Sequence, residues 1–135
     1  MSTFGHEKNL KAPLGRTWDA LVDVAALGTL LPSVDNASID NGGEFAPGFS
    51  WSETRTFDGE QFTKSWTVSS VDPYVSFLAD GPCGSRIRYS LKPIGDEETV
   101  LLVGYDSGDL DDHSRAEKLI QDDVAALDKA LSGGE

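Results

Sequence analysis

The dipeptide Asp58-Gly59 constrains the fold of this chain more than any other feature of its sequence. It separates two stretches with strand-like patterns, "GFSWSETRTF" at 48–57 and "EQFTKSWTVSSV" at 60–71. Asp-Gly between such stretches is a strong signal for a two-residue β-hairpin turn, because glycine and aspartate tolerate the positive φ angles that this turn requires. The sequence therefore predicts an antiparallel pair of strands whose register is set by the turn.

This register sorts the side chains of the two strands onto two different faces. One face carries small polar pairs, namely Ser50 with Thr67, Ser52 with Ser65, and Thr54 with Thr63. The other face pairs Trp51 with Trp66, Glu53 with Lys64, Arg55 with Phe62, and Phe49 with Val68. A slip of one residue would mix the two sets, so their separation supports the register. We expect the polar face to meet water and the aromatic face to be covered.

Five further stretches have strand-like patterns, and clusters of turn residues separate them. They are residues 3–11, 34–39, 74–79, 85–93 and 98–105. Seven strands in mostly hairpin order predict an antiparallel sheet. Two short helices are expected between the first two strands, one after Pro13 and a second from about Val24 to Leu31, before Pro32. Helices this short are stabilised by packing and not by propensity, so they must lie on the sheet.

One long helix is predicted at the end of the chain, from Ser114 to Leu131, with Ser114 and Glu117 as a capping box. Its apolar stripe consists of Ala116, Leu119, Ile120, Val124, Leu127 and Leu131. The predicted fold class is therefore α+β, with a curved seven-stranded antiparallel sheet that holds one long helix.

Composition and charge narrow the range of functions. The 135 residues suit one domain, which we place at 1–131, followed by a frayed tail at 132–135. A net charge of −12 without a basic cluster disfavours nucleic acid and anionic membrane surfaces as partners. Cys83 is the single cysteine, so the chain does not read as a secreted disulfide scaffold. No apolar run approaches the roughly 20 residues that span a bilayer, so we expect no integral membrane association and a cytoplasmic protein.

The charges on the covered face of the hairpin are the most informative feature for function. Glu53, Arg55 and Lys64 share that face with aromatic residues, and a buried charge must be paired or hydrated. Glu53 opposite Lys64 supplies one ion pair. Two interpretations remain open: an ion pair near the sheet edge that reaches water, or a partly wet cavity with a few placed polar groups, as in ligand sites.

Several segments together resemble a known family. They are Ala12-Pro13 followed by Trp18, Leu21 and Asp23, then residues 27–32, "SWTVSSVDP" at 65–73, "YSLKPIGDEETV" at 89–100, and the long last helix. Their order resembles the START-like superfamily with the helix-grip fold, which includes the polyketide cyclase/dehydrase-like (SRPBCC) proteins. The resemblance implies a hydrophobic cavity between sheet and helix. It implies neither a particular reaction nor a catalytic residue, because function must be argued from the site.

Three hypotheses for the function remain open. The first is a binding protein for a small hydrophobic or amphipathic molecule such as a lipid, an isoprenoid or an aromatic polyketide. The second is a cofactor-free aromatase/cyclase-type enzyme, in which Glu53 and a partner would steer proton transfer. The third is a protein–protein interaction module with a collapsed cavity. The expected cavity walls are Phe49, Trp51, Glu53, Arg55, Phe57, Phe62, Lys64, Trp66, Phe77, Tyr89, Leu119, Ile120 and Leu127.

Other candidate groups carry weaker signals. His6 has no second histidine of a zinc-protease motif and is expected to be structural, and Cys83 lies in a loop without an identifiable base. An acidic stretch lacks the spacing of an EF-hand calcium loop: Asp106, Asp109, Asp111 and Asp112. The sequence contains no phosphate-binding glycine loop, nucleophile elbow or dinucleotide fingerprint. We therefore predict neither a cofactor nor a metal site.

Overall fold

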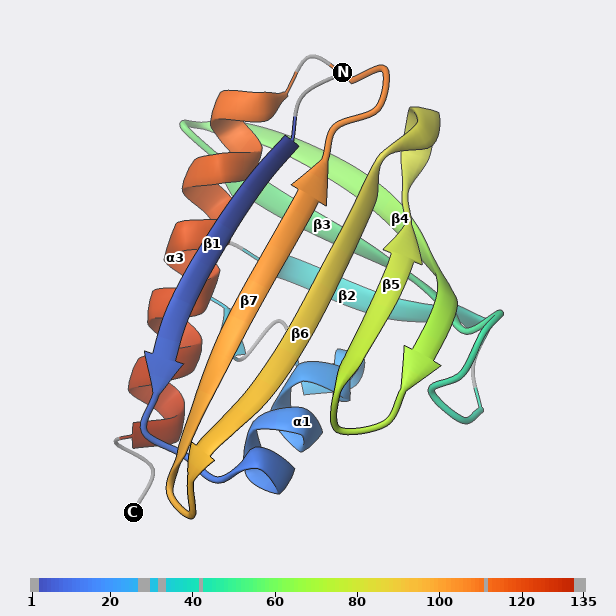
Figure 1. Cartoon of the computed structure of the whole chain (residues 1–135). Helices are drawn as coiled ribbons and strands as arrows, with labels where there is room; N and C mark the ends of the chain where they lie inside the picture. Colours follow the sequence, from blue (N-terminus) through green and yellow to red (C-terminus); the bar gives the residue numbers. More distant parts are fainter. Residues whose placement is uncertain (1–2, 27–29, 32–33, 42, 111, 133–135) are drawn as a thin grey trace.

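The protein is a seven-stranded antiparallel sheet that curves around one long helix (Figure 1). The computed structural model describes residues 3–26, 30–31, 34–41, 43–110 and 112–132. The strands are β1 (Thr3–Leu10), β2 (Val34–Asn41), β3 (Ser50–Phe57), β4 (Glu60–Asp72), β5 (Ser76–Asp80), β6 (Arg86–Gly95) and β7 (Glu98–Asp106). Their order in the sheet is β1-β7-β6-β5-β4-β3-β2, so only β1 joins a strand distant in sequence. The predicted antiparallel sheet is confirmed.

The β3–β4 hairpin has the register that the sequence predicts. Trp51 lies opposite Trp66, Glu53 opposite Lys64, and Ser52 opposite Ser65. Asp58 has a φ of 53° and Gly59 a φ of 81°, which are the positive values that a tight hairpin turn requires. Trp51 and Trp66 are buried, whereas the paired hydroxyls of Ser52 and Ser65 are on the exposed side. The prediction of a polar outer face and a covered aromatic face is therefore confirmed.

The long helix α3 (His113–Ser132) lies against the inner face of the curved sheet (Figure 1). It begins one residue before the predicted Ser114, and the carbonyl of Asp112 accepts the first bond from the amide of Ala116. Its predicted apolar stripe is buried at every position: Ala116, Leu119, Ile120, Val124, Leu127 and Leu131. Within the described part of the chain, neither this helix nor any other is long and apolar enough to cross a membrane.

The prediction of two short helices after the first strand requires correction. The α-helix α1 (Leu14–Val22) follows β1 as expected, and the hydroxyl of Thr17 donates to the carbonyl of Pro13 at its start. Where a second helix was predicted, from about Val24 to Leu31, Val24–Ala26 form the short 3₁₀ turn η1, and Leu30 is helical. Residues 27–29 and 32–33 lie outside the described residues. Runs of 3₁₀ structure are usually this short and often serve as connectors.

The two edges of the sheet differ. The strand β2 forms one edge of the sheet, and its pairing with β3 shifts register between Val34 and Asn36 and again between Ile39 and Asn41. At the opposite edge, α3 packs against β1.

The short turn η2 (Pro82–Gly84) contacts the loop between β7 and α3, where the amide of Asp109 donates to the carbonyl of Cys83 over 2.9 Å.

Candidate functional site

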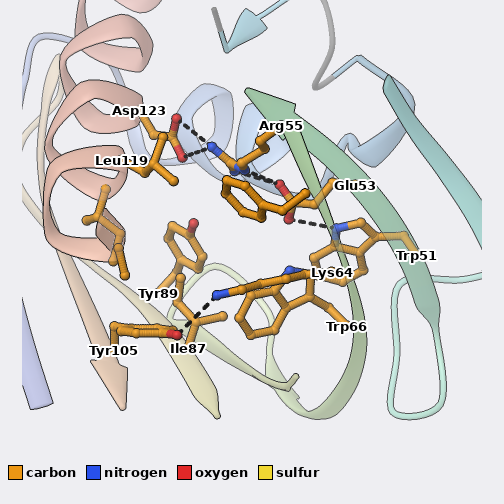
Figure 2. Close-up of a pocket in the computed structure, with 13 residues that line it drawn as sticks. Trp51, Glu53, Arg55, Lys64, Trp66, Ile87, Tyr89, Tyr105, Leu119 and Asp123 are labelled. Carbon is orange, nitrogen blue, oxygen red and sulfur yellow. Dashed lines mark hydrogen bonds and ion pairs between the residues drawn. The ribbon is translucent and has the colours of Figure 1, made fainter. Parts of the chain in front are cut away.

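Two adjoining cavities lie between the sheet and α3. The first, which we call the aromatic cavity, has a volume of about 60 Å³, counted as space open to the centres of water molecules. Its walls come from β3, β4, β6, β7 and α3. They are Trp51, Glu53, Arg55, Phe62, Lys64, Trp66, Ile87, Tyr89, Tyr105, Ala116, Leu119, Ile120 and Asp123 (Figure 2). This volume has room for several water molecules.

The second cavity, which we call the apolar cavity, lies toward α1 and has a similar volume of about 60 Å³. Aliphatic residues dominate its walls, which are Ala20, Leu21, Val24, Leu30, Leu31, Trp51, Glu53, Arg55, Phe77, Tyr89, Leu101, Val103, Ile120, Asp123, Val124 and Leu127. Six residues line both cavities: Trp51, Glu53, Arg55, Tyr89, Ile120 and Asp123. A group of charged side chains therefore lies where the two cavities meet.

Arg55 is the centre of that group. Its Nε and Nη2 lie 2.7 and 2.6 Å from Glu53 Oε2, and its Nη1 lies 3.0 and 2.9 Å from the two carboxylate oxygens of Asp123. Trp51 Nε1 donates to Glu53 Oε1 over 3.3 Å. Figure 2 shows Arg55 between the two carboxylates. We call Glu53, Arg55 and Asp123 the charged triad; two of its members come from β3 and the third from α3.

Lys64 belongs to a second polar group at the start of α3. Its ammonium lies 2.6 Å from Asp112 Oδ2 and 3.2 Å from the hydroxyl of Tyr105. The predicted ion pair between Glu53 and Lys64 is therefore wrong, although the two residues are opposite each other in the hairpin. The carboxylate of Glu53 bonds to Arg55 on its own strand instead, and Lys64 reaches the end of β7 and the residue before α3.

Burial and neighbouring charges shift the proton affinities of these groups. Burial raises the pKa of Asp123 to about 6, although Arg55 opposes the shift. Burial disfavours the charge of Arg55, but the carboxylates of Glu53 and Asp123 outweigh it and raise the pKa of the guanidinium. Burial, then Asp123 and Glu53, raise the pKa of Tyr89. Arg55 thus stays charged and Tyr89 neutral at physiological pH, and Asp123 changes its charge near the acid end of that range.

The structure brings together most of the residues that the sequence predicted for the cavity. The aromatic cavity contains Trp51, Glu53, Arg55, Phe62, Lys64, Trp66, Tyr89, Leu119 and Ile120, and the apolar cavity contains Phe77 and Leu127. Phe49 and Phe57 are among the lining residues of neither. Phe49 is buried against the rings of Phe45 and Trp51, and Phe57 lies half-buried at the hairpin end of β3.

The weaker candidates lie elsewhere. The ring of His6 stacks beside that of Phe4 on β1, and Cys83 is exposed in η2. Asp106 accepts a hydrogen bond from the amide of Gly108, and Asp112 forms an ion pair with Lys64. Asp111 lies outside the described residues. Among the described residues, no cluster of three or more histidine, cysteine or acidic side chains is arranged to hold a metal ion.

Sequence reasoning missed two polar residues of the site, Asp123 and Tyr105. Asp123 lies four residues after Leu119 and four before Leu127, so its position on the apolar stripe of α3 was visible in the sequence. An acidic residue on a buried stripe requires a partner, and that requirement was the available signal. Tyr105 ends a strand pattern whose other inward residues, Leu101 and Val103, are fully buried.

Comparison with known proteins is consistent with this geometry. No family model and no curated protein matches the sequence. The fold is similar to that of the di-domain ARO/CYC protein BexL from the BE-7585A biosynthetic pathway, with a TM-score of 0.77 and 16 % identity over 98 % of this chain. The chain spans 47 % of the length of BexL, or about half.

Other similar structures are matched over nearly their whole length, and two of them show this coverage. One is the Zhui aromatase/cyclase from Streptomyces sp. R1128, with a TM-score of 0.74, 18 % identity, and coverage of 98 % of this chain and 92 % of that one. The other is a START superfamily protein from Mycobacterium smegmatis, with a TM-score of 0.75, 18 % identity, and coverage of 97 % and 94 %. The chain therefore has the START-like helix-grip fold of the polyketide cyclase-like proteins, as its sequence indicates.

Proposed function

We propose that the protein binds a small amphipathic molecule with one or two rings in the cavities between the sheet and α3. The observation that carries the proposal is the charged triad at the junction of two largely apolar cavities. Ligand sites are usually apolar with a few placed polar groups, and the triad supplies those groups. Trp51, Trp66 and Tyr89 offer flat surfaces on which a ring can stack.

The size of the cavities favours a ring over a long acyl chain. Each cavity has room for several water molecules, and a ligand that spans both would place its polar group at the triad. This arrangement supports the binding hypothesis over an interior filled entirely by its own side chains. It also narrows the ligand from the broad class of lipids, isoprenoids and aromatic polyketides to compact ring compounds.

The experiment is a melting-temperature screen with one- and two-ring amphiphiles of positive, neutral and negative charge, combined with native mass spectrometry of the purified protein. A ligand that binds the folded state raises the melting temperature with its concentration. Trp66→Ala should abolish that rise. Trp18→Phe is the control, because Trp18 is buried but packs against Tyr74 and Phe77 and is not among the lining residues. If no compound binds the wild type at about 1 mM, which corresponds to some −4 kcal/mol, the proposal is wrong.

A second candidate function is a cofactor-free acid–base enzyme, and one observation favours it. The carboxyl of Asp123, whose pKa burial raises to about 6, lies beside the guanidinium of Arg55 and lines both cavities. A group with such a pKa can accept and return a proton near neutral pH. Turnover of a small aromatic-forming polyketone should then follow an ionisation near this pKa and be lost in Asp123→Asn. Binding of that compound without any conversion by the wild type would eliminate the enzyme hypothesis.

A further inference from the structure

The balance of charge at the apolar cavity indicates which kind of polar group its ligand carries. The charged residues that line this cavity are Glu53, Arg55 and Asp123. Both carboxylates bind the same guanidinium: Glu53 occupies Nε and Nη2, whereas Asp123 occupies Nη1. One cation thus faces two anions, and the lining of this cavity carries one excess negative charge whenever both carboxylates are ionised.

Lys64 does not compensate this excess. It lines the aromatic cavity, but its ammonium forms an ion pair with Asp112 over 2.6 Å and also meets the hydroxyl of Tyr105. Asp112 is buried, and Lys64 is needed to neutralise it. The pair is therefore neutral as a unit. It leaves the charge of the triad unchanged.

Asp123 is the member of the triad best placed to receive a ligand. Both oxygens of Glu53 are engaged, one by Arg55 and the other by Trp51. Asp123 receives its two bonds from a single nitrogen of Arg55, it lines both cavities, and it is 9 % exposed. A carboxylate oxygen has two lone pairs, so Asp123 retains acceptor capacity toward the cavity.

We propose that the ligand carries a protonated amine or another cationic N–H donor, which binds the Asp123 carboxylate while its ring occupies the cavity walls. This inference rests on the proposed binding function and specifies its ligand. A cation would cancel the excess charge of the triad. The rings of Trp51 and Tyr89, which line both cavities, would add cation–π attraction. An anionic ligand would meet two carboxylates that already share one guanidinium.

The proposal has a consequence for pH. The groups that face Asp123 are Arg55 and Glu53 from β3 and Tyr89 from β6, and its neighbour Asp122 lies exposed on the same helix. Because burial raises the pKa of Asp123 to about 6, its carboxyl takes up a proton as the pH falls below that value. A primary amine stays protonated throughout this range. Amine binding should therefore weaken on acidification, while binding of a neutral analogue should not.

The experiment uses three indole compounds that differ in charge: tryptamine, tryptophol and indole-3-propionate. Affinities are measured by calorimetry on the full chain at about pH 7.5. Tryptamine should bind about tenfold more tightly than tryptophol, which corresponds to some 1.4 kcal/mol, and indole-3-propionate should bind most weakly. Asp123→Asn should remove the preference for tryptamine. Asp122→Asn is the matched control, because it deletes the same charge from the exposed face one residue earlier and should leave the preference unchanged.

The outcomes distinguish a failure of the cationic-ligand inference from a failure of the proposed binding function. If tryptophol or indole-3-propionate binds the wild type as tightly as tryptamine, the inference is wrong and the proposed binding function stands. An equal loss in both variants would mean that the overall acidic surface attracts the amine, which also overturns the inference. If none of the three binds, the inference is wrong, and the melting-temperature screen decides the proposed binding function separately.

A second measurement does not depend on the folding of a variant. In the wild type, the affinity ratio of tryptamine to tryptophol should fall several-fold between about pH 7.5 and pH 5, because Asp123 loses its charge over that interval. A ratio that stays constant would contradict the role of Asp123.

Discussion

Asp123 shows how one side chain sets the character of the whole interior. It lies on the buried stripe of α3, where Ile120 and Val124 flank it. Within the described part of the chain, Arg55 is the cation that bonds to its carboxylate. Burying a charge without a partner costs several kcal/mol, so Asp123 and Arg55 depend on each other. The raised pKa of Asp123, about 6, records how incompletely Arg55 offsets the loss of water.

The first prediction concerns stability as a function of pH. The pKa of Asp123 is about 6 in the folded state and 3.8 in the unfolded reference, so the folded state holds this proton more tightly. Its contribution to stability is greatest below pH 3.8 and is lost as the pH rises through 6. The loss is about 3 kcal/mol, at 1.36 kcal/mol per pKa unit. Relative to Asp123→Asn, the wild type should therefore lose about this much free energy of unfolding between pH 3 and 7.

Urea denaturation at several pH values measures this difference. The difference between the free energies of unfolding of the two proteins cancels the contributions of all other titrating groups that the substitution leaves unchanged. Asp122→Asn provides the control, because its side chain is half-exposed. A difference that stays constant across the pH range would contradict the assignment.

The second prediction concerns the Lys64–Asp112 pair. Lys64→Met would leave the buried carboxylate of Asp112 without its closest cation, because Arg115 is 3.9 Å away and partly exposed. Breaking a buried pair costs about 3–5 kcal/mol, so unfolding should require much less urea. Lys118→Met removes a surface partner of Asp122 and should cost about 0.5 kcal/mol or less. The double variant Lys64→Met with Asp112→Leu should recover part of the loss, and failure to recover any would refute the pairing argument.

At this scale, the sequence identified which charges point inward but not which charges they meet. The hairpin register placed Glu53, Arg55 and Lys64 on the covered face, because alternation along a strand is a local property. One of the two partners of Arg55, Asp123, is in contrast 68 residues away on α3. Such a pairing depends on how the helix is positioned on the sheet, which no local pattern specifies.

At the scale of elements, strong local signals predicted structure well and weak ones did not. The Asp58-Gly59 turn and the alternation beside it gave the correct register for β3 and β4. The stripe of α3 gave the buried face of the helix. The predicted helix from about Val24 to Leu31 is a 3₁₀ turn over its first described residues, because a segment of that length has too few internal hydrogen bonds to dictate its own conformation.

The third prediction concerns the contact between η2 and the loop before α3. Gly108 has a φ of +59°, and a Cβ at this position would lie 2.5 Å from the carbonyl carbon of Gly84. Backbone atoms of both segments would have to move apart, so Gly108→Ala should destabilise the fold by about 2 kcal/mol. Hydrogen exchange should increase first at the start of α3. Gly104→Ala is the control, because a Cβ there meets nothing within 4 Å. Equal stability of the two variants would show that this contact is not tight.

At the scale of the whole molecule, the charge is the dominant property. The net charge is −12 on 135 residues, and repulsion between these like charges destabilises the compact state. Added salt screens that repulsion. The fourth prediction is that the melting temperature rises when sodium chloride increases from about 10 to 150 mM, over which the Debye length falls from about 30 to 8 Å. The buried triad is screened much less and should contribute little to this rise. A melting temperature that falls with salt would mean that surface ion pairs outweigh the repulsion.

The sequence also predicted the seven-stranded sheet and the long helix, through the order of its segments and their resemblance to the START-like superfamily. It did not give the division of the interior into two cavities. Arg55 is one of six residues that line both cavities, and its position depends on its contact with Asp123 on α3. Overall architecture is encoded redundantly along the chain, whereas the shape of a cavity depends on a few long-range contacts.

The irregular pairing of β2 has a consequence for how molecules of this protein meet one another. An open edge strand is a template onto which another chain can add, and such addition begins fibril growth and domain exchange. Here β2 shifts register twice within eight residues, and Asp35 and Asp40 bind hydroxyls of β3 close to that edge. A foreign strand would have to match two interruptions and approach two negative charges. Both features oppose polymerisation through the β2 edge of the sheet.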